Sequence, residues 1–262
     1  MDQRVLTSID TQGIATVTLN AAQKHNAFDD EVIAALRETF IALARNEKVR
    51  VVILAANGKS FSAGADLNWM KRMAQYDLAR NEDDARALAE MLQILYSLPM
   101  PTIARVQGAA FGGGVGLVAC CDIAIATDNA AFCLSEVKLG LIPATISPYV
   151  IKAMGERAAK RYFMTAERFD AGKALSLGLV SEIVPAEKLD TSIAALCHTL
   201  CGCGPTAVRA AKLLATEVGN KPIDNSLLED TSKRIAAIRV SAEGQEGLAA
   251  FLNKRKPNWI QE

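Results

Sequence analysis

The sequence lacks an excess of charge of either sign. Its 29 Lys and Arg residues are matched by 29 Asp and Glu residues, so the formal net charge is zero at pH 7. A nucleic-acid-binding domain needs a strongly basic surface, because it must neutralise phosphates. We therefore expect no nucleic-acid partner. The main non-enzymatic alternative is a non-catalytic structural or RNA-binding role, and the charge balance argues against the binding of RNA.

Long apolar runs are also missing. No uninterrupted apolar stretch approaches the roughly 20 residues that cross a bilayer. Residues 1–20 alternate polar and apolar side chains. They lack the basic start, apolar middle and small-residue cleavage site of a signal peptide. These absences predict a cytoplasmic protein with no membrane partner.

Metal-ligand spacing is absent as well. Of six cysteines, Cys197, Cys201 and Cys203 cluster with His198. A structural zinc site normally uses two ligand pairs separated by a longer loop. This cluster is compact and follows a helical pattern, so we expect no metal, and no disulfides in a cytoplasmic protein.

What the sequence does contain is an ordinary globular composition, with 50% hydrophobic and 22% charged residues. Period-two and continuous apolar runs predict strands, and apolar stripes at helical spacing predict helices. The predicted strands cover residues 5–9, 14–19, 51–54, 102–106, 122–126 and 179–184, and the predicted helices cover residues 30–44 and 79–97. After Pro143 the pattern is mostly helical. We expect an α/β core over residues 1–195, followed by a helical region over residues 196–262.

One segment occurs twice. Phe61 to Leu67 and Phe111 to Leu117 carry Phe, Gly and Leu at the same offsets. Each follows a predicted strand, forms a turn of small residues and starts a helix. Repeats of this size often stack as turns of a spiral.

These small-residue turns offer two possibilities. A helix N-terminus carries unpaired backbone N–H groups and a partial positive charge, and small residues let a ligand approach it closely. Two such turns on neighbouring strands would aim two N–H groups at one oxygen, as in an oxyanion hole. Close packing of helix against sheet demands the same small residues, so the composition alone leaves both interpretations open.

The second turn also matches a dinucleotide-binding pattern. Gly114, Gly116 and Ala119 fit G-x-G-x-x-A. A Rossmann unit needs a helix of normal length before its next strand. Here the strand beginning at Asp122 follows almost at once, which argues against a dehydrogenase.

Glu136 is the main titratable candidate. It lies in an apolar segment that runs from Phe132 to Pro143. A carboxyl in such surroundings has a raised pKa, which suits proton transfer near neutral pH. The presence of Glu136 is explained equally well if it is an acid in the first turn of a Ser-initiated helix, where it complements the helix dipole.

At these positions the sequence resembles the crotonase superfamily, also called the enoyl-CoA hydratase/isomerase family. The resemblance covers almost the whole chain. It is carried by the segments Phe61–Leu67, Gln107–Gly114, Cys121–Ala126, Glu136–Pro143 and Phe251–Pro257. It implies a spiral of ββα units, a C-terminal helical trimerisation region, and a homotrimer or a dimer of trimers.

The resemblance also implies roles for residues. The backbone N–H groups of Ala65 and Gly113 would hold the thioester oxygen of an acyl-CoA, and Glu136 would be the acid/base. Coenzyme A would enter as part of the substrate, so no separate cofactor is expected. The resemblance implies that the acyl-CoA contacts Lys24, Ala27, Phe28, Ala63, Asp66, Leu67, Asn68, Gly112, Phe251 and Lys254.

One position departs from the family pattern. Typical hydratases of this family carry two glutamates; Glu136 matches the second, and the first falls at Gly116. A single glutamate at the second position is also the pattern of relatives that move the double bond of an enoyl-CoA. A Δ3-Δ2-enoyl-CoA isomerase is therefore the alternative to a hydratase.

The segment from Leu141 to Phe163 resembles methylglutaconyl-CoA hydratases of leucine breakdown and the related isohexenylglutaconyl-CoA hydratases. Their substrates carry a second carboxylate, and we expect it to take over part of the role of the glutamate that is missing at Gly116. The sequence offers three cations to bind it and two acids as a second proton donor, with nothing in the spacing to select among them. The cations are Arg72, Arg105 and Lys138, and the acids are Asp77 and Glu82.

Overall fold

The computed structural model describes residues 3–260 and contains one large and one small β-sheet. The large sheet has the strand order β1-β2-β3-β5-β7-β10. The hairpin partners β1 and β2 are antiparallel, and all other neighbours in this sheet are parallel. The strands are β1 (Val5–Ile9), β2 (Ile14–Leu19), β3 (Val51–Ala56), β5 (Thr102–Val106), β7 (Ile123–Thr127) and β10 (Glu182–Val184).

The small sheet has the order β4-β6-β8-β9, with only β9 antiparallel to its neighbour. Its strands are β4 (Ser60–Ser62), β6 (Ala109–Phe111), β8 (Ala131–Cys133) and β9 (Phe169–Asp170). The chain therefore alternates between the sheets three times, as β3-β4, β5-β6 and β7-β8. Each pair leads into a helix, which confirms the expected spiral of ββα units.

The helices that end these turns differ in length. The first turn continues into α2 (Leu67–Met73) and α3 (Leu78–Tyr96), the second into α4 (Gly113–Cys120), and the third into the 3₁₀ helix η2 (Glu136–Leu139). The third turn is the one that the repeat in the sequence did not reveal. It places Glu136 at the same point of its turn as Gly113 holds in the second.

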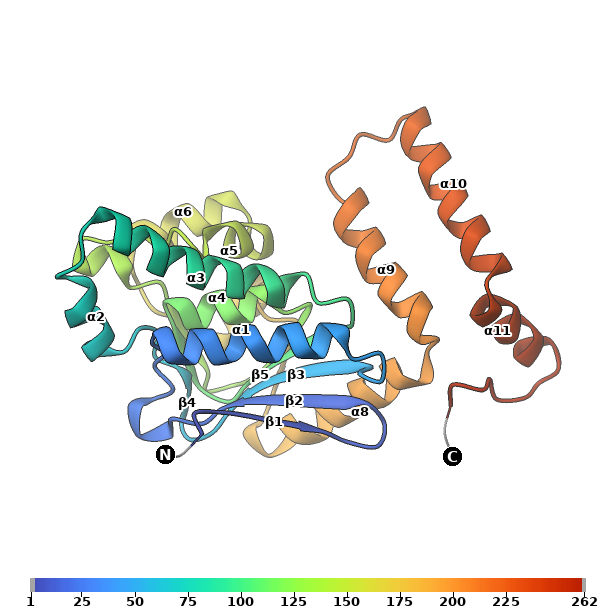
Figure 1. Cartoon of the computed structure of the whole chain (residues 1–262), viewed down its shortest axis with the longest axis horizontal. Helices are drawn as coiled ribbons and strands as arrows, with labels where there is room; N and C mark the ends of the chain where they lie inside the picture. The colour runs from blue at the N-terminus through green and yellow to red at the C-terminus, as the bar shows by residue number, and fades with distance from the viewer. Residues whose placement is uncertain (1–2, 261–262) are drawn as a thin grey trace.

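Helices cover both faces of the large sheet (Figure 1). Helix α1 (Asp30–Arg45) begins at Asp29, whose side chain accepts a hydrogen bond from the Val32 amide. Its apolar stripe packs with Val52 and Leu54 of β3 in the main core. On the opposite face, α8 (Leu189–Gly202) packs Ile193 against Val51 and Ile103. Alternate residues of one strand thus belong to two separate clusters.

A helical arm projects from this core (Figure 1) and touches it through Arg209, which donates to the Val49 carbonyl (3.0 Å), and Lys212, which pairs with Asp122 (2.7 Å). It consists of α9 (Pro205–Val218), α10 (Asn225–Val240) and α11 (Ala242–Leu252). The division expected between residues 195 and 196 falls inside α8, which packs on the sheet, so by packing the arm begins at Pro205. The remaining elements are η1 (Ala22–Lys24), α5 (Ser147–Met154), α6 (Glu156–Thr165), α7 (Ala171–Ser176) and η3 (Ala186–Lys188). Residues 1, 2, 261 and 262 of the two expected parts lie outside the described residues.

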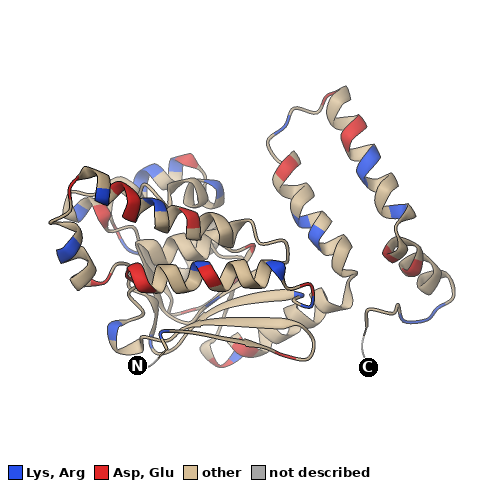
Figure 2. Cartoon of the chain, in the orientation of Figure 1, with Lys and Arg blue, Asp and Glu red and all other residues tan. Residues whose placement is uncertain are grey.

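Charged side chains lie mainly on the outer helices, whereas the strands and α4 carry few (Figure 2). Between residues 3 and 260, no helix combines the length and the apolar character needed to cross a membrane. In the same range, no group of three or more His, Cys, Asp and Glu residues is placed to hold a metal ion.

Candidate active site

The two small-residue turns lie against each other. A Cβ atom added to Gly64 would stand 3.0 Å from the Phe111 carbonyl oxygen, and one added to Gly114 would stand 2.8 Å from the Ser62 carbonyl oxygen. Gly64 also has φ +86°, a conformation that other residues rarely adopt. The close approach of the two turns therefore requires glycine at both positions.

Ala65 is held by the backbone of Phe28. The Phe28 amide donates to the Gly64 carbonyl (2.8 Å), and the Asp66 amide donates to the Phe28 carbonyl (3.0 Å), which forms an isolated parallel bridge. In such a bridge the N–H of Ala65 itself points away from Phe28. Within residues 3–260 this N–H finds no hydrogen-bond acceptor.

Gly113 offers a second free donor. It is the first residue of α4, where the N–H groups have no partner inside the helix and the helix dipole is positive. A Cβ at Gly113 would stand 2.2 Å from Cζ of Phe28, so the buried Phe28 ring fills the space beside it. The Phe28 ring is thus occupied in packing, and only its backbone is left to act at the site.

Glu136 lies beside the second turn. A Cβ added to Gly112 would stand 3.2 Å from Oε1 of Glu136, and the Gly112 amide donates to the Cys133 carbonyl at 2.8 Å. The Oε2 atom of Glu136 is buried and has no hydrogen-bond partner among the described residues. Burial raises the pKa of this carboxyl above its ordinary value, and a hydrogen bond from its own backbone opposes the shift.

The position of the missing glutamate is filled with hydrocarbon. A Cβ added to Gly116 would stand 2.2 Å from Cγ2 of Ile146 and 3.8 Å from Cδ2 of Leu92. Ile146 is only 2% exposed. Neither acid considered as a second proton donor is free and buried: Asp77 caps α3 through the Arg80 amide, and Glu82 is exposed.

The expected CoA-binding segment is fixed by Asp66. This side chain caps α2 by accepting from the amides of Asn68 (2.8 Å) and Trp69 (3.2 Å). It also forms an ion pair with Lys24 at 2.9 Å, and this contact is the main reason why the pKa of Asp66 is lowered. This ion pair brings the expected contact residues Lys24 and Asp66 together, and Asp66 directly follows Ala65 in the sequence.

The sequence reasoning missed two side chains that shape the first turn. The Ser62 hydroxyl donates to the Asn26 carbonyl (2.9 Å) and accepts from the Gly64 amide (3.2 Å). The Asn26 side chain donates to the carbonyls of Asn57 (2.7 Å) and Ser60 (2.8 Å). No motif marks these contacts, because they join residues distant in the sequence.

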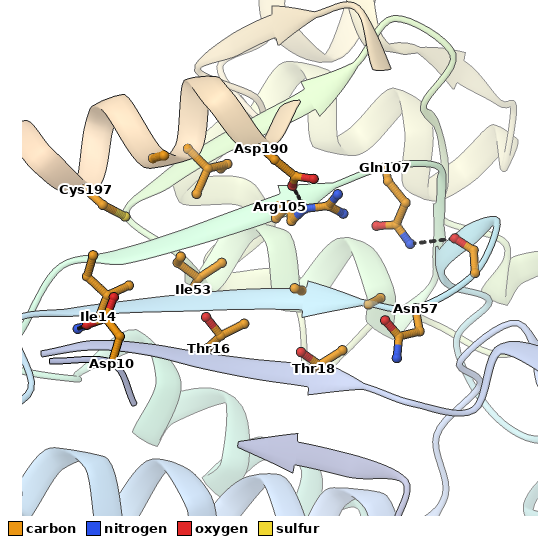
Figure 3. A pocket seen from close by; sticks show the side chains of 15 residues that line it. Asp10, Ile14, Thr16, Thr18, Ile53, Asn57, Arg105, Gln107, Asp190 and Cys197 are labelled. Atoms are coloured by element: carbon orange, nitrogen blue, oxygen red, sulfur yellow. Dashed lines mark hydrogen bonds and ion pairs between the residues drawn. The ribbon is translucent and has the colours of Figure 1, made fainter. Parts of the chain in front are cut away.

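Three of the expected residues are not brought to this site. Phe251 and Lys254 belong to the arm, where α11 packs against α9 and α10 (Figure 1). Arg105, a candidate for binding a second substrate carboxylate, lies on the face of the large sheet that α8 covers. There it pairs with Asp190 at 2.6 Å in a depression of about 640 Å³ (Figure 3). The structure therefore does not bring Arg105 to the turns of Ala65 and Gly113.

Known proteins share the fold of this chain. A model of the enoyl-CoA hydratase/isomerase family matches residues 10–262. A crystal structure of an enoyl-CoA hydratase from Shewanella pealeana is 49% identical, covers 98% of this chain and 96% of its own, and superposes with a TM-score of 0.94. The corresponding values for Pseudomonas aeruginosa AtuE are 34% identity, 99% and 100% coverage, and a TM-score of 0.92.

Among curated proteins, the 2,3-dehydroadipyl-CoA hydratase of Escherichia coli is 29% identical, and the match covers 95% of each chain. The match of the family model over almost the whole chain, together with the shared spiral fold, shows the family. The chain belongs to the enoyl-CoA hydratase/isomerase family.

Proposed function

We propose that the chain adds water across the 2,3-double bond of an enoyl-CoA, with Glu136 as the only protein acid/base. The observation that carries this proposal is the placement of the Glu136 carboxyl, with its unpaired Oε2, against the turn that presents the Gly113 amide. The free amide of Ala65 lies on the adjoining turn. A carbonyl oxygen held by two such donors is stabilised as it becomes negative.

The reaction follows from these groups. The thioester oxygen accepts hydrogen bonds from the amides of Ala65 and Gly113. The Glu136 carboxylate takes a proton from water while the water oxygen bonds to the β-carbon, and the π electrons move to the enolate. Glu136 then returns that proton to the α-carbon, so one water is added and the carboxylate is regenerated.

We further propose a substrate whose acyl group carries a second carboxylate, methylglutaconyl-CoA of leucine and isovalerate degradation or the related isohexenylglutaconyl-CoA. The resemblance of residues 141–163 to methylglutaconyl-CoA hydratases supports this choice. So does the name of the related 2,3-dehydroadipyl-CoA hydratase, because a dehydroadipyl group also carries a second carboxylate. We propose Lys138 as the cation that binds that carboxylate, because it lies in the same short helix η2 as Glu136, is exposed, and forms no ion pair within residues 3–260. Arg72, by contrast, is paired with Asp30.

The isomerase remains the second candidate, and one observation favours it. Moving a double bond needs only one carboxyl to carry a proton between two carbons, and Ile146 excludes a second acid at Gly116. Glu136 would take a proton from C2 of a 3-enoyl-CoA and return it to C4.

The arm supports a proposal for assembly. Several large apolar side chains on it are exposed, among them Ile223, Val240, Phe251 and Leu252. Exposed apolar surface of this extent is typical of an interface. We propose that the arms join chains into a homotrimer or a dimer of trimers, and that Phe251 and Lys254 reach the CoA of a neighbouring chain.

The test compares three substrates on one preparation. Methylglutaconyl-CoA and crotonyl-CoA are followed for hydration, and a 3-enoyl-CoA is followed for the ultraviolet absorbance of the conjugated product. Hydration of methylglutaconyl-CoA with the highest kcat/KM is expected. Equal kcat/KM for crotonyl-CoA would remove the role of the second carboxylate, and faster conjugation of the 3-enoyl-CoA would replace the hydratase by the isomerase.

The role of Glu136 is tested in the same assay. Glu136→Gln should lower kcat by about 10²–10⁴-fold with little change in CoA affinity. Glu156→Gln is the matched control, because Glu156 is an exposed residue of α6 that pairs with Lys160. Full activity of Glu136→Gln would contradict the proposal.

A further inference from the structure

Two contacts lie one above the other along α4. Gly112, which precedes the helix, faces Oε1 of Glu136, and Gly116 faces Cγ2 of Ile146. The Gly116 amide donates to the Gly112 carbonyl (3.3 Å), so these two glycines are one helical turn apart. Gly112 is the N-cap residue, with φ +51° and ψ −121°, so its backbone is not helical. The contacts of Glu136 and Ile146 lie within one turn of each other at the start of α4.

Residues 136–146 form a loop that starts and ends beside α4. The Leu141 amide donates to the Glu136 carbonyl (3.1 Å), and Ile146 immediately precedes α5. The loop thus leaves the helix face at Glu136 and returns to it at Ile146. Its return is anchored by a methyl group that lies where a side chain at position 116 would be.

The Ile146 side chain adds apolar surface to this end of α4. Ile146 is 2% exposed, and Leu92 of α3 contacts the same glycine. The buried Oε2 of Glu136 has no partner among the described residues. A carboxyl oxygen in this state binds water readily once space is opened, because water requires polar partners and a cavity of about one molecule.

We propose that Ile146, seated on Gly116, is a positioning residue that keeps solvent other than the reacting water away from Glu136 and thereby sets the pH below which the enzyme loses activity. The inference rests on the proposed role of Glu136. It assigns to Ile146 no contact with the reacting atoms. Its effect is exerted through the hydration of the carboxyl.

Charged neighbours do not explain the behaviour of Glu136. Burial is the main cause of its raised pKa, and no charged side chain contributes to the shift. The titratable and charged side chains on the surrounding elements are Cys120 on α4, Cys133 on β8, Lys138 on η2, Arg168 before β9, and Glu156, Arg157, Lys160, Arg161 and Tyr162 on α6, which packs against η2. A change at position 146 therefore acts on hydration and leaves these charges in place.

The experiment is a volume exchange read out by pH. The dependence of kcat/KM on pH is measured for wild type, Ile146→Ala, Gly116→Ala and the double variant. Ile146→Ala should admit water and move the acid limb to lower pH by about 0.5–1 unit. In the double variant the methyl group that Gly116→Ala introduces refills part of the space, so the acid limb should return toward wild type.

Ile193→Ala is the matched control. Ile193 is 4% exposed and packs on the opposite face of the large sheet, where α8 lies. The same truncation there should leave the acid limb unchanged. An unshifted limb in Ile146→Ala, or an equal shift in Ile193→Ala, would overturn the inference. If Ile146→Ala fails to fold, Ile146→Thr keeps the branched shape and tests the same shift, because its hydroxyl brings polarity next to the carboxyl.

A direct titration separates this inference from the proposed function. The Glu136 carboxyl is followed by carbon NMR in the substrate-free protein, with Glu136→Gln to assign the signal. A shift in Ile146→Ala by NMR in a chain without hydratase or isomerase activity would remove the proposed function and keep the role of Ile146. Activity with no NMR shift would do the reverse.

Discussion

The ring of Phe28 stands where a side chain at Gly113 would have to be, since a Cβ there would lie 2.2 Å from the Phe28 Cζ atom. The same Phe28 bonds through its backbone to both neighbours of Ala65. Phe28 alone, two positions before α1, thus holds the first turn with its main chain and limits the second with its side chain. This explains how turns some fifty residues apart keep a fixed relation.

Gly113→Ala should therefore lose activity without losing the fold. The new methyl group would push α4 away from Phe28 and misplace an amide donor, and removal of one such donor costs about 10²–10³-fold in kcat. Steady-state kinetics on the best acyl-CoA substrate measure the loss. Phe28→Leu in the same chain should restore part of the activity by making room. Unchanged kcat in Gly113→Ala would show that this amide does not contact the reacting oxygen.

Glu136→Gln should stabilise the protein at neutral pH. Burial raises the pKa of Glu136, so the folded state binds this proton more tightly than the unfolded state does. Its ionisation then lowers stability as pH rises from the unfolded pKa through the folded one. Denaturant unfolding at pH 4 and pH 7.5 should show a gain for the variant at the higher pH only. An equal gain at both pH values would mean that ionisation of the Glu136 carboxyl does not destabilise the folded protein.

Asp66→Ala should reduce both stability and activity. The variant loses the cap of α2 and the ion pair with Lys24, and loss of a cap costs about 0.5–2 kcal/mol. Since Asp66 directly follows Ala65, kcat/KM should also fall. Asp170→Ala is the matched control, because Asp170 caps α7 through the Lys173 amide. It should lower stability alone, and an equal loss of activity in both variants would disconnect Asp66 from the site.

Lys138→Ala and Arg105→Ala should separate on a dicarboxylic substrate. Lys138 lies in the same 3₁₀ helix as Glu136, whereas Arg105 pairs with Asp190 on the far face of the sheet. Lys138→Ala should raise KM for methylglutaconyl-CoA about tenfold, the loss of one charge-assisted contact, and leave crotonyl-CoA unaffected. Arg105→Ala should change neither. The opposite outcome would assign the second carboxylate to the other sheet face.

Much of this arrangement was predictable from the sequence. The hairpin, α1 and the strands 102–106 and 122–126 follow from periodicity and capping, and the structure confirms them within one or two residues. The predicted strand 179–184 shortens to β10 because Leu179 and Val180 are still in the turn after α7. The turns at Gly64 and Gly113 were visible as small residues, because their close approach needs glycine.

Other features depend on contacts that a single sequence does not contain. β8 has three residues, too few for an alternation to show, so the third turn of the spiral was missed. Arg105 could not be separated from the other two candidate cations, because alternation in β5 tells which residues share a face and not which face meets the site. The fit of Ile146 to Gly116 joins two segments that are distant in the sequence, and no local pattern reports it.

A crystal structure of the chain with a bound 3-hydroxyacyl-CoA tests the account most directly. We expect the thioester oxygen about 2.7–3.1 Å from the amide nitrogens of both Ala65 and Gly113, with a Glu136 oxygen within hydrogen-bond distance of the 3-hydroxyl group. A thioester oxygen that contacts neither amide, or a Glu136 carboxyl turned away from the hydroxyl group, would contradict it.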